Sequence, residues 1–205
     1  MKKITDTLVI FGPCRLSYLS VFSPRLNNMN GKEEYSAVLL IPKEPTEFCK
    51  DPKAVGKFVT EAIKAALAEK FGKEPPKWSN PLKDGDTETN NDNQPKHPGY
   101  WFLPVSAKAE YPPVLIDGKR NTAKPEHGWV SGDWGVVKVN FFAYEFEGKK
   151  GVSAGLRALQ FLYKDEPFGS ASSPEAVAAE FDEVDDAAAP ELVTAGSASY
   201  DPWAD

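Results

Sequence analysis

The 205-residue sequence has few of the residues that build disulfide and metal sites. It contains two cysteines, Cys14 and Cys49, and two histidines, His97 and His127. Neither cysteine has another Cys or a His at metal-ligand spacing, which argues against a disulfide framework and against a structural zinc site. We therefore expect two reduced thiols, no metal and no cofactor.

Long apolar runs and catalytic motifs are also missing. No stretch of about 18 apolar residues is present, so the sequence predicts no membrane span. The opening stretch, MKKITDTLVIFGPC, holds two lysines but too short an apolar run for a signal peptide. A phosphate-binding loop, a dinucleotide fingerprint and a nucleophile elbow are absent. These absences predict a cytoplasmic protein that is not an enzyme.

Basic residues are absent from the end of the chain. All 24 lysines and arginines lie in residues 1–168, beside 21 Asp and Glu, so this body has a net charge of +3. Residues 169–205 hold nine acids and no base. A basic body joined to an acidic tail is a pattern associated with nucleic-acid binding. We expect a folded domain over 1–168 and a flexible acidic tail over 169–205.

The body is rich in turns and in short β-type segments, with 18 prolines and 15 glycines in the whole chain. Residues 14–22 alternate, which places Leu16 and Tyr18 on one face and Ser17 on the other. Residues 34–43 are a second apolar, β-rich run that ends near a proline. Together these two segments predict a β-hairpin.

Residues 51–72 form the one convincing helix. Asp51 is suited to cap it, Pro52 fits its first turn and Gly72 fits its end. Apolar residues recur at spacings of three and four within it, which predicts one buried stripe.

More strands are predicted in the second half of the body. Residues 100–117 fit two short strands, and residues 134–148 are the clearest strand. Residues 151–165 fit either a strand or a helical turn followed by a strand, because periodicity does not separate the two. Several short strands, one amphipathic helix and long loops predict a mainly β fold with a small β-barrel.

The loop over residues 73–98 contains KDGDTETNND, whose carboxylates invite a calcium or magnesium site. These acids are Asp84, Asp86, Glu88 and Asp92. An EF-hand needs Gly at its sixth position and Glu at its twelfth, but counting from Asp84 these positions are Thr89 and Pro95. The pattern therefore favours a solvated turn that is bent by its Asp-Gly pair.

Aromatic and basic residues are interleaved along the predicted strands and loops. Such mixtures bind single-stranded nucleic acid, because bases stack on rings while cations contact phosphates. The basic candidates are Arg15, Lys43, Lys83, Lys108 and Lys138, and the candidate stacking rings are Tyr18, Trp78, Trp101, Phe142 and Tyr144. Burial in a core is the default for any one ring. Phe142 and Tyr144 are the best candidates, because they share a strand face with a lysine and an asparagine.

The order of motifs resembles a known family. GPCRLSYLSVFSP, EEYSAVLLIPK, NPLKDGD and SGDWGVVKVNFFAYEFEGKKGVSAGLRALQ precede a polar acidic tail. This order is similar to that of the phage-encoded OB-fold single-stranded DNA-binding proteins, over residues 8–168. The resemblance implies an OB-type barrel that binds single-stranded DNA in phage DNA replication or recombination, in the cytoplasm of the infected bacterium. A standard OB barrel has its helix between the third and fourth strands, whereas here the helix follows a shorter β-region.

The tail ends in SASYDPWAD, and its tip is the candidate site for a partner. Its tip residues are Tyr200, Asp201, Trp203 and Asp205. Bacterial single-strand binders end in an acidic run and a terminal Phe, so a phage or host replication or recombination protein of different specificity is the expected partner. The acids and rings also imitate phosphates and bases, which predicts competition with DNA for the groove.

Other functions stay open at this point. The same barrel fits a duplex DNA or RNA binder. A body charge of only +3 also fits a protein-interaction or virion-assembly module that does not contact nucleic acid. A nuclease would use Asp84, Asp86 and Glu88. The oligomeric state, including a homo-oligomer, is also open.

Overall fold

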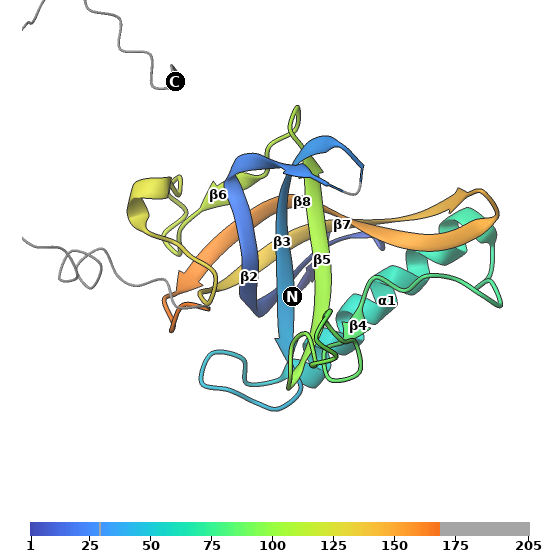
Figure 1. Ribbon diagram of the computed structural model, residues 1–205, viewed down its shortest axis with the longest axis horizontal. Helices are drawn as coiled ribbons and strands as arrows, with labels where there is room; N and C mark the ends of the chain where they lie inside the picture. The colour runs from blue at the N-terminus through green and yellow to red at the C-terminus, as the bar shows by residue number, and fades with distance from the viewer. Residues whose placement is uncertain (29, 169–205) are drawn as a thin grey trace, which may run out of the picture. The chain divides into compact units, whose positions relative to one another are not determined.

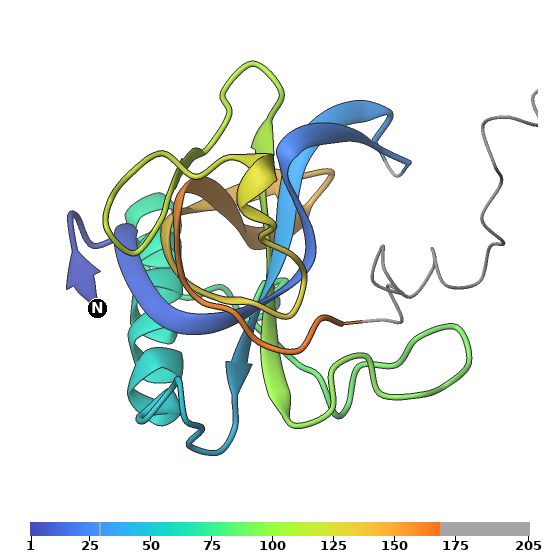
Figure 2. The same ribbon diagram turned by 90° about the vertical axis from the view of Figure 1, so that its left-hand side faces the viewer.

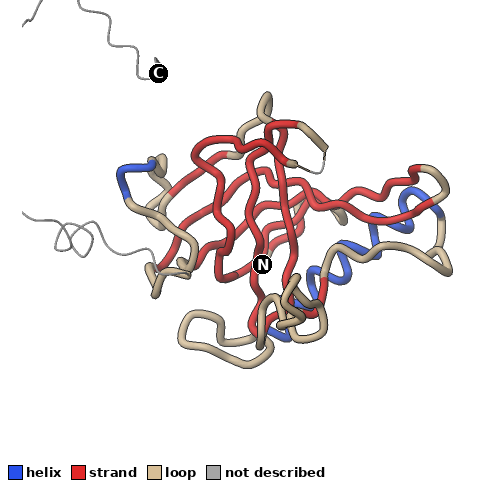
Figure 3. The backbone as a smooth tube through the Cα atoms, viewed as in Figure 1, coloured by secondary structure: helices blue, strands red, loops and turns tan. Residues whose placement is uncertain are grey.

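The structure, a computed structural model, describes residues 1–28 and 30–168. Residue 29 and residues 169–205 lie outside the described part, and so does the predicted acidic tail with its tip. The described elements are β1 (Lys2–Lys3), β2 (Leu8–Asn27), β3 (Lys32–Pro42), α1 (Pro52–Phe71), β4 (Lys83–Asp84), β5 (Tyr100–Lys108), β6 (Val114–Ile116), the 3₁₀ turn η1 (Pro125–His127), β7 (Trp134–Phe146) and β8 (Lys149–Tyr163). Figure 3 shows how strongly strands dominate this part of the chain.

The strands form one sheet that closes into a barrel. The hydrogen-bonded order is β4-β5-β3-β2-β7-β8-β6. A further, parallel pairing between Ser106 of β5 and Gly155 of β8 closes the five-stranded ring β5-β3-β2-β7-β8. Figure 2 looks into this ring. The mainly β, OB-type barrel expected from the sequence is therefore confirmed.

Helix α1 follows the second strand of the ring in chain order, because it lies between β3 and β5. The Asp51 carboxylate accepts a hydrogen bond from the Ala54 N–H at 2.9 Å, and Gly72 ends the helix with a left-handed φ of 72°. Its buried stripe consists of Val55, Val59, Ala62, Ile63, Ala66 and Leu67. The predicted helix is confirmed, and so is its unusual place in the barrel order.

The predicted hairpin and the last strand are also present. Strands β2 and β3 pair antiparallel, with Arg15 opposite Leu40. Residues 149–163 form the continuous strand β8, which settles the choice that periodicity left open. In Figure 1 the β7–β8 hairpin extends beyond the barrel along α1.

The inner faces of the ring strands and the buried stripe of α1 form one hydrophobic core. Its largest fully buried side chains include Phe11, Leu39, Leu103, Trp134, Phe141 and Phe161. Cys14 and Cys49 are free, buried thiols, and burial raises the pKa of both. Among the residues described here, no helix is long and apolar enough to cross a membrane.

Candidate nucleic-acid interface

A groove crosses the outer face of β3, β5 and β8; we call it the barrel groove. It encloses about 360 Å³. Its lining includes Ser36 and Val38 of β3, Pro104 and Ser106 of β5, Ser153 of β8, and Lys83 and Tyr18 at its sides. Many of the side chains along its floor, such as Ser36, Ser106 and Ser153, are short, which leaves room for the groove. The outer face of the second and third ring strands is the surface on which OB-folds bind oligonucleotides.

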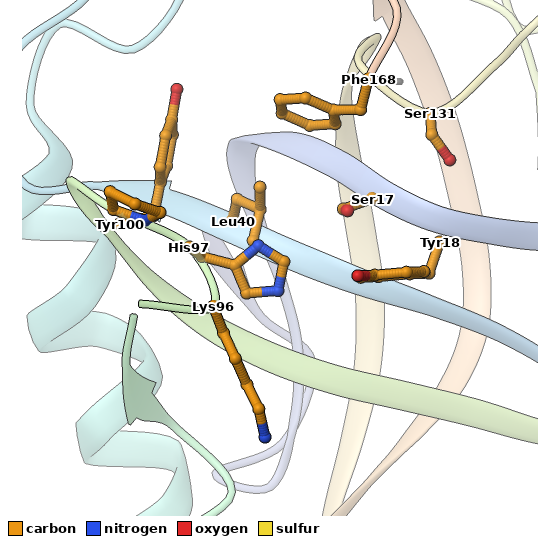
Figure 4. Close-up of a pocket in the computed structure, with 9 residues that line it drawn as sticks. Ser17, Tyr18, Leu40, Lys96, His97, Tyr100, Ser131 and Phe168 are labelled. Carbon is orange, nitrogen blue, oxygen red and sulfur yellow. The ribbon is translucent and has the colours of Figure 1, made fainter. Parts of the chain in front are cut away.

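A second hollow, the Tyr18 pocket, adjoins the barrel groove and encloses about 450 Å³. Its walls, drawn as sticks in Figure 4, are Ser17, Tyr18, Leu40, Lys96, His97, Pro98, Tyr100, Ser131 and Phe168. Tyr18 lines both hollows, so its ring stands where they meet. The two hollows together provide a path across one side of the barrel.

Tyr18 is turned outward by a bulge in β2. The pairing of β2 with β3 slips between Ser17 and Ser20, and Tyr18 adopts a left-handed φ of 47°. The bulged backbone is held from elsewhere, because the Leu19 N–H donates to the Ser131 hydroxyl at 2.9 Å. Strict alternation, which predicted a shared face for Leu16 and Tyr18, is wrong here: Leu16 is fully buried and Tyr18 is 72% exposed. Bulges commonly re-aim a side chain in this way.

The opposite wall of the Tyr18 pocket comes mainly from the 85–99 loop. Ion pairs to Lys43, the residue that follows β3, hold this loop in place, and we call them the clamp. The Lys43 ammonium lies 2.5 Å from an Asp84 carboxylate oxygen and 2.6 Å from one of Asp86. The other Asp86 oxygen accepts the Gly99 N–H at 2.7 Å. Hydrogen bonds from Lys43 hold the pKa of both carboxyl groups below the usual value, and the two carboxylates raise the pKa of Lys43.

The turn that the sequence predicted for KDGDTETNND is present at residues 85–87, and the clamp adds ion pairs to it. Two of its acids, Asp84 and Asp86, neutralise Lys43, and Glu88 lies 3.7 Å from the Lys83 ammonium. Within residues 1–28 and 30–168, no group of three or more Cys, His, Asp or Glu side chains could hold a metal ion.

Gly85 sits directly beneath His97 in this loop. The His97 N–H donates to the Gly85 carbonyl at 3.1 Å, and the Gly85 N–H donates to the Tyr100 carbonyl at 2.9 Å. A Cβ at position 85 would overlap the carbonyl oxygen of His97, so only glycine allows this approach. The His97 ring then lies between Phe102, at 5.0 Å, and Tyr18, at 6.0 Å between ring centroids.

Burial keeps His97 uncharged near neutral pH. The pKa of its imidazole is lowered, first by burial and then by the nearby Lys96 ammonium. A neutral imidazole has one N–H donor and one nitrogen acceptor. The pocket wall therefore offers both hydrogen-bonding functions beside an aromatic ring.

The structure brings several predicted DNA-binding residues to the barrel groove. Tyr18 and Lys83 line it. Phe142 is 48% exposed and pairs across β7–β8 with Ser153 of the groove lining. Lys108 ends β5, opposite Glu34, which also lines the groove.

Tyr144 and Lys138 lie on the same outer face of β7 as Phe142, and neither lines the groove. The Tyr144 ring covers Gly151, since a Cβ at Gly151 would overlap it. Lys138 pairs with Ala158 of β8, and its ammonium has no partner among the residues described here. These residues extend the candidate surface along the β7–β8 hairpin.

Other predicted residues have structural partners away from the groove. Trp101 packs against Gly56 of α1, with its ring 3.7 Å from where a Cβ would be, and the Trp78 indole N–H donates to the Glu74 carboxylate at 2.9 Å. Lys43 belongs to the clamp described above.

Arg15 is engaged by the segment that precedes residue 169. Its guanidinium donates to the Gly132 carbonyl at 2.9 Å and to the Glu166 carbonyl at 2.8 Å. It also lies 4.1 Å from the centroid of the Phe168 ring. Arg15 therefore fixes Phe168, a wall of the Tyr18 pocket, in place.

Sequence reasoning missed the remaining pocket walls. Ser17, Lys96, His97, Ser131 and Phe168 come from β2, two loops and the end of the described chain. A loop histidine beside a proline has no periodic signal to place it. The one available hint is that KDGD and KHPGY both border the same long loop.

Comparisons with known proteins agree with this arrangement. The sequence model of the family described as "Enterobacter phage Enc34, ssDNA-binding protein" matches residues 7–189. Protein p50 of Acyrthosiphon pisum secondary endosymbiont phage 1 is 30% identical over 192 residues, which cover 87% of this chain and 95% of that protein.

Solved structures give the same fold. The single-stranded DNA-binding protein from bacteriophage Enc34 in complex with ssDNA matches with a TM-score of 0.64 at 22% identity, over 82% of this chain and 97% of that one. The structure of the Enc34 protein alone matches with a TM-score of 0.63 at 21% identity, over 87% and 97% of the two chains. The barrel with its single helix is thus an arrangement already observed in solved structures.

Proposed function

The chain belongs to the family of the single-stranded DNA-binding protein of Enterobacter phage Enc34, and from this premise we propose that it binds single-stranded DNA independently of sequence. One observation carries the proposal: an exposed, left-handed Tyr18 stands where two hollows meet on the oligonucleotide-binding face of an OB barrel. Strained, exposed aromatic residues of this kind cluster at functional sites.

The strand would follow the barrel groove past Tyr18. Bases stack on rings with about 1–3 kcal/mol each, whatever their identity, so Tyr18 and Phe142 offer contacts that do not read sequence. The short side chains of the groove floor let the sugar–phosphate backbone approach β3 and β5. Lys83, Lys96 and Lys108 lie along or beside the two hollows and supply positive charge for the phosphates.

The proposed role is binding rather than catalysis. A protein that covers single strands without reading their sequence suits phage DNA replication and recombination, which take place in the cytoplasm of the infected bacterium. Membership of a phage single-strand-binding family supports this role.

The acidic tail is proposed to regulate access to the groove. Residues 169–205 carry nine acids and no base, and the described chain ends with Phe168 on the wall of the Tyr18 pocket. A tethered acidic segment that starts there would have an effective concentration up to the millimolar range and would compete with phosphates. When DNA displaces it, the tip around Tyr200 and Trp203 would become available to a phage or host replication or recombination protein.

The tail proposal is tested by deleting residues 169–205. Affinity for oligo-dT should rise several-fold at about 50 mM salt, and the gain should shrink as salt rises, because screening weakens charge competition. A variant with Tyr200 and Trp203 replaced by Ala keeps the charge and should reproduce part of the gain. Unchanged affinity after the deletion would show that the tail does not occupy the groove.

Binding itself is tested by fluorescence anisotropy of labelled oligo-dT over a series of salt concentrations. We expect log Kd to rise with log salt with a slope of about 0.7 per phosphate neutralised. Unlabelled oligo-dT should displace the probe far better than a duplex of equal length. No binding at low salt contradicts the proposal, and equal displacement by duplex shows that the barrel is instead a general DNA binder.

A further inference from the structure

We propose that the Tyr18 pocket holds one nucleobase that leaves the path of the bound strand, an inference that rests on the proposed single-strand binding. The ligand class is a single unpaired base stacked on Tyr18, with its polar edge toward Ser17, Ser131 and His97. Figure 4 shows these side chains on different sides of Leu40, with Ser17 and Ser131 to its right and His97 below it.

The size and lining of the pocket suit a small planar ring. Its volume of about 450 Å³ falls within the range of roughly 300–1,000 Å³ that is usual for small-molecule sites. Leu40, Pro98 and Phe168 provide apolar walls, while serine hydroxyls and an imidazole provide a few polar groups. This mixture of apolar walls and few polar groups is typical of sites that bind a flat heteroaromatic ligand.

Tyr18 is free to stack. Its ring contacts His97 in a T-shaped arrangement, at an interplanar angle of 78°, and the residue is still 72% exposed, so most of it is uncovered. A non-glycine residue in the left-handed region is strained and persists only where its surroundings enforce it. Here the Leu19–Ser131 hydrogen bond enforces it, which keeps an exposed ring beside the pocket.

Polar groups in the pocket have unused hydrogen-bonding capacity. Ser17 lines the pocket, and its hydroxyl has no hydrogen-bond partner among the residues that the structure describes. Neither imidazole nitrogen of His97 has a hydrogen-bond partner within that same part of the chain. The Ser131 hydroxyl accepts from Leu19 and keeps its own proton to donate. The edge of a base carries donors and acceptors that would satisfy these groups.

The pocket is continuous with the proposed DNA path. Tyr18 is a wall of both hollows, and Lys96 stands on the pocket lining, where it can meet the phosphate of the displaced nucleotide. A base that leaves the barrel groove at Tyr18 and enters the pocket therefore stays attached to a DNA strand that remains in the groove. Its occupant is thus a nucleotide of the bound strand.

The test is an abasic scan with the full-length protein. The shortest oligo-dT that binds with full affinity is prepared with one abasic nucleotide at each position in turn, and Kd is measured by anisotropy. One position should weaken binding by about 5- to 150-fold, the loss expected for one stacked base, and its neighbours by less. A penalty that is equal at all positions would overturn the pocket assignment.

The variant His97→Ala tests whether the oligo-dT position with the largest abasic penalty is the one that occupies this pocket. It should weaken binding of intact oligo-dT and remove most of the excess penalty at that position. His127→Ala, in the exposed η1 turn, is the matched control and should leave the profile unchanged. A His97→Ala protein that keeps the full position-specific penalty overturns the assignment.

A second variant moves His97 without removing it. Gly85→Ala places a Cβ against the His97 carbonyl, whereas Gly118→Ala meets only an ordinary contact at 3.7 Å. Gly85→Ala should reduce the same position-specific penalty, and Gly118→Ala should not; an unchanged profile in a folded Gly85→Ala protein counts against the pocket. The failure of the proposed function looks different, because intact oligo-dT then fails to bind wild-type protein at low salt.

Discussion

The groove side and the helix side of the barrel both contain aromatic rings near lysines, but the rings are exposed on the groove side and packed on the helix side. On the groove side, Tyr18 and Phe142 are exposed beside hollows lined by short side chains. On the helix side, Trp101 packs against Gly56. Trp78, which directly precedes the groove residues Ser79–Pro81, is hydrogen-bonded to Glu74. Rings near lysines therefore do not identify a nucleic-acid surface by themselves. The local backbone determines whether a ring is exposed or packed. The bulge in β2 exposes Tyr18, whereas Gly56 of α1 leaves room for the Trp101 ring.

The largest expected difference between the two sides is in the paired variants Tyr18→Ala and Trp101→Ala. Tyr18→Ala should weaken oligo-dT binding by about 1–3 kcal/mol, the value of one stacked base, with little change in melting temperature. Trp101→Ala should instead reduce the free energy of unfolding by about 2 kcal/mol, less than a fully buried Trp loses.

Anisotropy and thermal denaturation measure these two effects, and Tyr18→Phe is the control that keeps the ring. The assignment of Tyr18 to DNA binding and of Trp101 to packing is contradicted if Trp101→Ala loses affinity at unchanged stability while Tyr18→Ala binds normally.

Phe142 and Tyr144, two rings on β7, should contribute differently to DNA binding. Because Phe142 stands beside Ser153 at the edge of the groove, Phe142→Ala should weaken oligo-dT binding by about 1 kcal/mol, the low end for a stacked base. Tyr144→Ala should cost less, since the Tyr144 ring is already engaged over Gly151. The two Kd values, each with a melting temperature, check this order. A larger loss of affinity for Tyr144→Ala than for Phe142→Ala would indicate that the bound DNA lies further out along the β7–β8 hairpin.

Lysines on the two sides should differ in their salt dependence. Lys108→Met, at the end of β5, should reduce the log–log salt slope of oligo-dT binding by about 0.7, because one phosphate contact is lost. Lys64→Met is the matched control on α1, where Lys64 is exposed and has no ion-pair partner among the described residues. Equal changes in slope for both variants would show that the charge acts diffusely and not along the groove.

The smallest expected effect is on the pH dependence of stability. The pKa of His97 is lowered in the folded protein, so the unfolded chain takes up its proton first as pH falls below about 6.5. Wild type should therefore lose unfolding free energy more steeply below this pH than His97→Gln. Denaturant unfolding at pH 7.5, 6.5 and 5.5 measures the difference, and parallel curves would mean that His97 is not desolvated.

Local signals in the sequence were enough for part of this fold. The helix was predictable because Asp51, Gly72 and the apolar stripe all act within one segment. Strand β8 was not, since its register depends on β7 across the hairpin. The hairpin of β2 and β3 was predictable from two neighbouring apolar runs.

The candidate site was less predictable because its geometry is set by distant residues. Tyr18 faces outward through a bulge that is held by Ser131, 112 residues away. His97 reaches the pocket on a loop that Lys43 clamps through Asp84 and Asp86 and in which Gly85 allows a close approach. Composition could suggest stacking rings and phosphate contacts, but it could not separate a clamp lysine from a groove lysine.

Photocrosslinking tests the central claim most directly. Oligo-dT with 5-iodouracil in place of thymine is bound to the full-length protein and irradiated, and the crosslinked peptides are identified by mass spectrometry. The account predicts adducts on peptides that contain Tyr18 and Phe142, on the groove side of the barrel. Adducts confined to the Trp78 and Trp101 side chains themselves, located by fragmentation within their peptides, would contradict it; the peptides alone do not decide, because they also carry groove residues such as Ser79 and Ser106.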